Sequence, residues 1–415
     1  YESNIDPFLR YIHNQNIKPC AWVEISNYKV TDNNTRCDYN ITINHTDITP
    51  LDINKISPLL IASFDIECTS SHGDFPLAKK DYKKVVQDIT AVSKVGYDID
   101  KECFIYWIQQ IFKQDIIIEP SLIINKVYPK KNVDMTNILN DFLSHTTGLV
   151  WEKISENDTS SLIELKSNKL GLELFNNKKE FTQDEFKTFN IKTNVNISNF
   201  VKYNNSYFKP INYITEIINI LDKISDETDN DDDDDNDDSI KTKKLNISEL
   251  NRLEDRLNKI LTSILPELLG DEIIQIGTTV HRYGSDEIIY RNIVSLNSCD
   301  SIENCDIIEC KTEKQLIREW KKIIQALNPD VLIGYNIFGF DMDYIWLRTI
   351  ELNMNEEFSE GLGRKIDRKC GLFKQELSSS ALGENILKYF DMDGMIIIDL
   401  FKVMQKDHKL DSYKL

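Results

Sequence analysis

The chain has 415 residues, of which 41% are hydrophobic and 28% charged, which is enough apolar material for a buried core in two or three domains. No apolar run approaches the ~18 residues needed to cross a bilayer, and no signal-peptide pattern opens the sequence, so we expect an intracellular protein without a membrane span. The net charge of −19 argues against a nucleic-acid partner, but ten acids fall within residues 226–238 and the remaining charge is −9, so DNA binding stays open.

Several catalytic patterns are missing from the sequence. It contains neither a GxxxxGK[ST] nor a GxGxxG loop, and its six histidines are scattered. The eight cysteines form no CxxC pair and are too widely spread for a zinc site, so reduced thiols are expected. The chain begins with Tyr1 rather than Met and reaches Leu415 without a stop signal, and we interpret it as a fragment open at both ends.

The first strong strand signal is the segment PLLIASFDIEC, residues 58–68. It is a nearly continuous apolar run with charges only at its end, which is typical of a middle strand in a sheet covered on both faces. Because side chains alternate along a strand, Asp65 and Glu67 point to one face and Ile66 to the other.

Residues 83–270 interrupt the β-rich pattern, and we interpret them as a largely helical inserted domain, with a helical stretch at 101–114. The run SDETDNDDDDDNDDS at 225–239 is expected to be a disordered acidic linker, because ten like charges repel each other and bury nothing. An amphipathic helix follows at residues 250–268, closed by Gly270.

The remaining elements are expected in the order hairpin, helix, strand, helix. Two strand patterns flank Gly284, a helix with a capping box starts at Thr312 and runs to Leu327, a short buried strand spans 331–335, and a helix spans 338–352. With the strand at 58–68, this order matches the ribonuclease H-like fold. The predicted class is therefore α/β: a mixed sheet with flanking helices, plus part of a mixed α+β N-terminal domain and the insertion.

Three acids are candidates for catalysis. Asp65 and Glu67 lie side by side without a nearby Lys or Arg in the sequence, and a divalent metal would relieve their repulsion. Asp341 falls early in the helix that follows Asn336, which is a good N-cap type. Each has an ordinary explanation, because Asp-x-Glu often ends a strand and an acid suits a helix N-terminus. Asp343 is a weaker candidate on an exposed face.

Together these acids are typical of a carboxylate site for two metal ions about 3.5–4 Å apart, which cleaves phosphodiesters by activating water.

The strings that carry these acids resemble exonuclease motifs of the B-family DNA polymerases. FDIEC at 64–68, followed by Gly73 and Phe75-Pro76, is similar to the first motif, and NPDVLIGYNIFGFD at 328–341 to the second. The segments 1–12 and 20–23 resemble the N-terminal domain of the delta-type branch, and 399–415 resembles the stretch after the second motif. The resemblance covers about 1–82 and 271–415, and the long insertion and the Asn/Ile-rich composition are most like polymerases of large nucleocytoplasmic DNA viruses.

This resemblance implies domains and roles. Residues 1–55 would belong to the polymerase N-terminal domain, and 56–82 with 271–415 to the 3′–5′ proofreading exonuclease. Asp65, Glu67 and Asp341 would bind two Mg²⁺ or Mn²⁺ ions. Asn336, Phe75 and Phe340 would contact DNA, Asn336 at the frayed primer end and Phe75 against its bases.

The same resemblance implies the setting of the intact protein. The third motif and the polymerase domain would lie beyond Leu415. Expected partners are primer–template DNA, its single-stranded 3′ end and a sliding clamp or other replication factors, with no membrane. The expected location is the nucleus or a cytoplasmic viral replication site. Two alternatives stay open: a standalone ribonuclease H-like nuclease, or a DNA-binding module without catalysis.

Deleting residues 226–238 should leave the melting temperature of the chain unchanged within about 1 °C, because a run of like charges buries nothing. Calorimetry of the deletion and the intact chain would measure this, and a large drop in Tm would contradict it.

Overall fold

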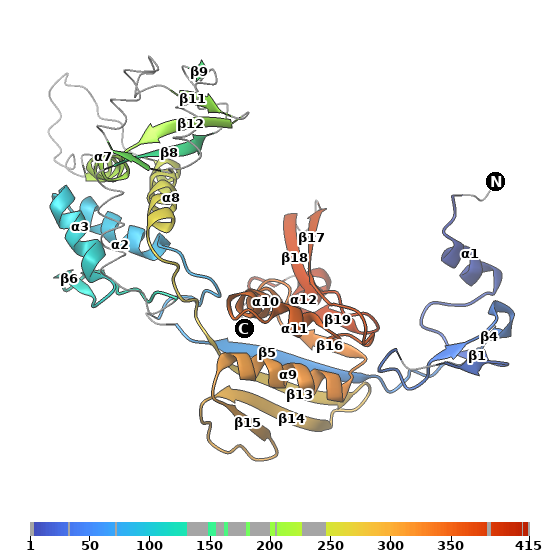
Figure 1. The fold of residues 1–415 in the computed structure, drawn as a ribbon. Helices are drawn as coiled ribbons and strands as arrows, with labels where there is room; N and C mark the ends of the chain where they lie inside the picture. Colours follow the sequence, from blue (N-terminus) through green and yellow to red (C-terminus); the bar gives the residue numbers. More distant parts are fainter. Residues whose placement is uncertain are drawn as a thin grey trace. The chain divides into compact units, whose positions relative to one another are not determined.

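The structure of the chain is a computed structural model. It describes residues 4–31, 34–70, 73–130, 148–154, 162–164, 180–182, 200–203, 206–225, 246–379, 383–408 and 410–413. The chain forms two compact units (Figure 1): Tyr1–Lys79 with Gly270–Leu415, called the sheet unit, and Lys80–Leu269, called the insertion unit. The chain therefore leaves the sheet unit once and returns to it.

A six-stranded mixed sheet forms the centre of the sheet unit, in the order β15-β14-β13-β5-β16-β19. β13 is antiparallel to both β5 and β14, whereas β16 is parallel to β5 and β19, and β15 is parallel to β14. The expected middle strand and the expected mixed sheet are confirmed. The strands are β5 (Leu60–Cys68), β13 (Ile273–Arg282), β14 (Ile288–Leu296), β15 (Asp306–Cys310), β16 (Val331–Gly334) and β19 (Ile396–Asp399).

Helices and a hairpin complete the sheet unit. Trp320 of α9 packs on Phe64 of β5, with ring centroids 5.1 Å apart, so α9 covers the buried face of the sheet. Sequence patterns predicted neither β15 and β19 nor the β17–β18 hairpin, because short runs have a weak periodicity signal. These further elements are α9 (Glu313–Leu327), α10 (Asp341–Glu351), α11 (Asn355–Ser359), α12 (Leu400–Asp407), and the antiparallel hairpin of β17 (Leu372–Ser379) and β18 (Gly383–Phe390).

Helix ends depart from the sequence prediction in detail. At the start of α9 the Thr312 side chain accepts from the Gln315 backbone N–H at 3.2 Å. The Gln315 side chain accepts from Lys311 N–H instead of Thr312 N–H, so the capping box is only half formed. The amphipathic helix α8 spans Ile247–Ile264 and stops before Pro266 rather than at Gly270, because a following proline disfavours the helical backbone.

The N-terminal part of the sheet unit consists of short elements. Arg36 connects it to the segment after α11, since its guanidinium Nη1 donates to the carbonyl oxygens of Gly361 and Gly363 at 2.6 and 2.7 Å. The elements are α1 (Pro7–Asn14), β1 (Val23–Ile25) paired with β4 (Ile48–Pro50), β2 (Lys29–Val30) paired with β3 (Ile41–Thr42), and a 3₁₀ turn at His45–Asp47.

The insertion unit has its own core, in which Val92, Ile108 and Ile217 are fully buried. We expected it to be largely helical; the structure adds strands to its helices. The acidic residues 226–238 lie outside the described part of the chain. The elements are α2 (Lys83–Lys94), α3 (Lys101–Gln110), α7 (Tyr213–Ser225), α8, the pair β6 (Ile116–Glu119) and β7 (Leu122–Ile124), and a five-stranded sheet of β10 (Glu180–Thr182), β8 (Gly148–Ile154), β12 (Ser206–Ile211), β11 (Phe200–Tyr203) and β9 (Leu162–Glu164).

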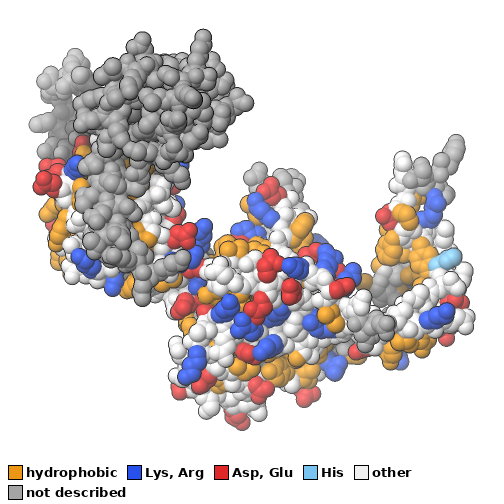
Figure 2. Space-filling model, viewed as in Figure 1, with side chains coloured by type: hydrophobic (Ala, Val, Ile, Leu, Met, Phe, Trp, Pro, Cys, Tyr) orange, Lys and Arg blue, Asp and Glu red, His pale blue; other side chains and the backbone are white. Residues whose placement is uncertain are grey.

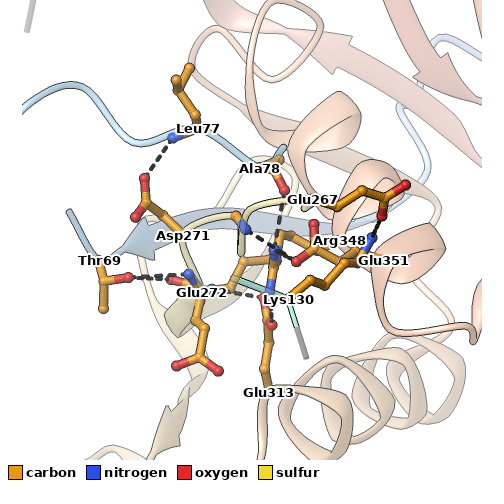
Figure 3. Close-up of polar contacts among 12 residues, drawn as sticks. Thr69, Leu77, Ala78, Lys130, Glu267, Asp271, Glu272, Glu313, Arg348 and Glu351 are labelled. Carbon is orange, nitrogen blue, oxygen red and sulfur yellow. Dashed lines mark hydrogen bonds and ion pairs between the residues drawn. The ribbon is translucent and has the colours of Figure 1, made fainter. Parts of the chain in front are cut away.

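A buried arginine fastens the places where the chain leaves and re-enters the sheet unit (Figure 3). Arg348 of α10, 2% exposed, forms a two-pronged pair with Glu313 of α9, at 2.8 and 2.6 Å. Its Nη1 donates to the carbonyl of Ala78 and pairs with Glu351, both at 3.1 Å. Glu351 in turn accepts from Gly270 N–H at 3.1 Å.

Gly270 has no room for a side chain in this arrangement. An added Cβ would lie 2.0 Å from the carbonyl oxygen of Ala78 and 2.5 Å from Nη1 of Arg348. The close approach of the two chain segments therefore requires glycine at this position.

Replacing Arg348 with Met should lower the free energy of unfolding by about 3–5 kcal/mol, because the Glu313 carboxylate would stay buried without its partner. Urea unfolding followed by tryptophan fluorescence measures the loss. Arg318→Met is the matched control, since the Arg318–Glu357 pair is 37% and 47% exposed and should contribute less than about 1 kcal/mol. Equal losses in the two variants would contradict the assignment.

Candidate active site

The central strand β5 carries two of the predicted acids on one face. Phe64 and Ile66 are 3% and 5% exposed and enter the core, whereas Asp65 and Glu67 are exposed. This is the alternation that the sequence predicted. The two carboxylates therefore project from the middle of the sheet on the face opposite the apolar core.

Asp341 is the first residue of α10 and lies beside Asp65. It is 2% exposed, and its Oδ1 accepts from the backbone N–H of Ile66 at 3.3 Å. Burial and, to a smaller extent, the negative charge of Asp65 raise the pKa of the Asp341 carboxyl to about 7. The structure thus brings together acids from two elements that are far apart in sequence.

Glu67 lies on the same face of β5 as Asp65, but it does not close a cluster of metal ligands with the other two acids. Within the described residues, no group of three or more His, Cys, Asp or Glu side chains is arranged to hold a metal ion. The Asp65–Asp341 pair nevertheless suits a cation, because a divalent ion would favour the ionised form of the buried carboxyl. Its ligands would be hard carboxylate oxygens, which suit Mg²⁺ and Mn²⁺.

Cys68 lies next to this pair and does not change the choice of metal. Burial is the largest cause that raises the pKa of its thiol to about 12, and the negative charges of Asp341 and Glu67 add to it. A thiol must lose its proton to bind a soft metal. The ligands available at neutral pH are therefore the carboxylates.

A tight turn connects β16 to α10, and Asn336 starts it. Its backbone is left-handed, with φ of 62°, and its carbonyl accepts from Gly339 and Phe340 N–H at 2.9 and 3.0 Å. The prediction that Asn336 caps the helix is wrong: the cap position is Phe340 and α10 begins at Asp341. The hydrogen bonds of Asn336 close the turn instead of starting the helix.

The Asn336 side chain packs over a glycine in this turn. A Cβ on Gly339 would lie 2.4 Å from the side-chain oxygen of Asn336. The position of the Asn336 amide therefore depends on Gly339.

Aromatic rings lie beside the turn. The Phe75 ring is 72% exposed and packs edge-on against Phe340, with centroids 5.2 Å apart, and Phe340 lies 5.0 Å from Tyr344. The structure thus brings Phe75 and Phe340, both predicted to contact DNA, into one aromatic group. On the face of the sheet unit that Figure 2 shows, which carries α9, acidic and basic side chains are interspersed.

Asp343, the weaker candidate, is not on an exposed face. It is half-buried and forms an ion pair with Lys388 of β18 at 2.5 Å. This pair ties α10 to the hairpin, which accounts for Asp343 without a catalytic role.

Sequence reasoning missed Asp399, the last residue of β19. It is 2% exposed and accepts backbone hydrogen bonds from Asn336, Phe338 and Phe401 at 2.8, 3.0 and 2.9 Å. A local signal for part of this role was present, because Asp before the apolar pattern of 400–407 is typical of an N-cap. Its contact with the Asn336 turn had no local signal.

No helix in the described ranges is both long and apolar enough to cross a membrane.

The sequence matches the family described as DNA polymerase family B, exonuclease domain, over residues 1–146 and 179–415. The DNA polymerase of Pyramimonas orientalis virus is 37% identical over 418 residues, covering 100% of this chain and 30% of that protein. The DNA polymerase of Phaeocystis pouchetii virus is 30% identical over 442 residues, covering 100% of this chain and 38% of that protein. The DNA polymerase delta catalytic subunit of Dictyostelium discoideum is 39% identical over 152 residues, covering 37% of this chain and 14% of that protein.

The chain thus spans 30% and 38% of the lengths of its two viral relatives. The family match covers most of the chain and agrees with the resemblance found in the two acidic motifs and with the mixed sheet. This chain belongs to the exonuclease domain family of the family B DNA polymerases.

Proposed function

We propose that this chain removes nucleotides from the 3′ end of a DNA primer, as the 3′–5′ proofreading exonuclease region of a DNA-directed DNA polymerase. The observation that carries the proposal is the buried Asp341 carboxyl beside Asp65, on the face of β5 that also carries Glu67. Burial and the nearby charge of Asp65 raise the pKa of the Asp341 carboxyl. Such a pair suits a cation site better than a structural role, because the arrangement is costly without a cation.

Asp65, Glu67 and Asp341 would hold two Mg²⁺ or Mn²⁺ ions. When bound, such ions activate water and stabilise the charge that develops on the phosphate and the leaving oxygen. The carboxylates keep their oxygens directed to one face of the sheet. The resemblance to the family implies a further ligand from its third exonuclease motif.

The aromatic pair would bind the end of the single strand. Phe75 is exposed on one side and supported by Phe340 on the other, so a base can stack on it without sequence preference. Asn336 would contact the frayed 3′ nucleotide from the turn that ends at Asp341. Together these residues would hold the last phosphodiester over the acids.

We propose further that the intact protein synthesises DNA during replication, with residues 1–55 in its N-terminal domain and 83–270 as an insertion. Its partners would be primer–template DNA and a sliding clamp or another replication factor. It would act in the nucleus or at a cytoplasmic viral replication site. The similarity to viral polymerases over the whole chain supports this setting over a standalone nuclease.

Changing Asp65 to Ala in the intact polymerase should abolish excision of a mispaired primer end and leave DNA synthesis unchanged, since the two activities use separate sites. Gel assays of excision and extension measure both rates. Asp343→Ala is the matched control, because Asp343 pairs with Lys388 and its loss should spare excision. Equal loss of synthesis and excision in the Asp65 variant would reject the assignment.

Asp341 should also make stability depend on pH. Its pKa is about 7 in the folded chain, against an ordinary value of 3.8, so the unfolded chain loses this proton first as the pH rises. The free energy of unfolding therefore falls as the pH rises from the unfolded pKa to the folded pKa, and it stays lower at higher pH. Asp341→Asn removes the effect, so without metal it should raise Tm near pH 8 and give little gain near pH 4.

The free energies of unfolding of the wild type and of Asp341→Asn should differ by a few kcal/mol at most, because each unit between the folded and unfolded pKa values is worth about 1.4 kcal/mol. Excess Mg²⁺ should raise the Tm of the wild type more than that of the variant. Calorimetry in EDTA and in Mg²⁺ tests both points. A gain from Asp341→Asn that is the same at both pH values would contradict the electrostatic cause.

A further inference from the structure

We propose that Asp399 is a positioning residue, which holds the Asn336 turn so that the Asn336 side chain reaches the 3′ end of the DNA. The inference rests on the proposed exonuclease function. It adds a residue that none of the acidic motifs contains and that acts through the backbone of another segment.

The sheet places Asp399 at the start of this turn. β16 and β19 are parallel neighbours, and Asp399 pairs in register with Gly334 at the end of β16. The chain leaves the sheet immediately after Gly334 and packs tightly there, since an added Cβ would lie 2.3 Å from Ile337 and 2.8 Å from the carbonyl oxygen of Phe64. The Asp399 carboxylate therefore lies where the first turn residues present their N–H groups.

Both carboxylate oxygens are used in these contacts. Oδ1 accepts from Asn336 and Phe401 N–H, and Oδ2 accepts from Phe338 N–H. A buried acceptor-only group suits three donors, whereas an amide would present its own N–H₂ to one of them. With its oxygens occupied and 2% of its surface exposed, Asp399 is a backbone anchor rather than a metal ligand.

The hydrogen bond to Asn336 N–H stabilises a left-handed residue. Asn tolerates this backbone region better than most residues but does not prefer it. The turn has a second anchor, because the Phe338 carbonyl accepts from Lys388 N–H of β18 at 3.1 Å. Loss of Asp399 should therefore release the Asn336 end of the turn while the Phe338 carbonyl stays bound.

Two variants separate the turn contacts from the cap of α12. Asp399→Asn keeps the size of the side chain and loses one acceptor. Asp399→Ser keeps an N-cap hydroxyl for Phe401 N–H and loses the reach to the turn. Asp330→Asn is the matched control, because Asp330 binds Leu60 N–H at 2.8 Å at the opposite end of β16.

The experiment measures kcat and KM for excision of a single-stranded oligonucleotide by the intact polymerase, with DNA synthesis and Tm measured in parallel. Both Asp399 variants should lower kcat/KM about tenfold to a hundredfold, the usual cost of a misplaced contact. Synthesis and the half-saturating Mg²⁺ concentration should not change. Asp330→Asn should keep excision at the wild-type rate.

Combination with Asn336→Ala distinguishes positioning from general destabilisation. If Asp399 acts through Asn336, the double variant should be no less active than the less active of the two single variants. Losses that multiply, a shift in the half-saturating Mg²⁺ concentration, or unchanged excision in the Asp399→Ser variant would each overturn the inference. Excision that survives Asp65→Ala would instead reject the proposed function itself.

Discussion

The buried pair between Arg348 and Glu313 is the interaction on which the arrangement of the sheet unit depends. It joins the last turn of α10 to the first turn of α9, and Arg348 also holds the Ala78 carbonyl. Burying two charges is costly, and the two-pronged geometry offsets that cost. Because α10 begins with Asp341, the same pair that holds the end of the helix also orients its first residue toward β5.

This pair also explains how a large insertion attaches without disturbing the sheet. The chain leaves the sheet unit after Lys79 and returns at Gly270, and both sites are bound to the Arg348 group through Ala78 and Glu351. The two crossing segments are thus anchored in the sheet unit itself. The insertion unit has its own hydrophobic core, which shares no residue with the core of the sheet unit.

The candidate site is assembled where parallel strands end. β5, β16 and β19 are neighbours in this order, and their carboxyl ends carry Asp65, the Asn336 turn and Asp399. Ligands commonly bind at the carboxyl ends of parallel strands, where loops from several strands converge. Here the convergence places an acid pair, a left-handed turn residue and an aromatic group next to one another, and the proposed excision of a DNA end would use all three.

The sequence by itself determined which faces the catalytic candidates occupy. Alternation placed Asp65 and Glu67 opposite the core of β5, and the strand–helix pattern placed Asp341 in the first turn of α10. The first is a local property set by the period of two in a strand. The second follows from the apolar pattern of the helix, which nevertheless begins at Asp341 rather than near residue 338. Only the tertiary structure decided that Asn336 closes a turn held by Asp399, 63 residues later, because that contact depends on which strands become neighbours in the sheet.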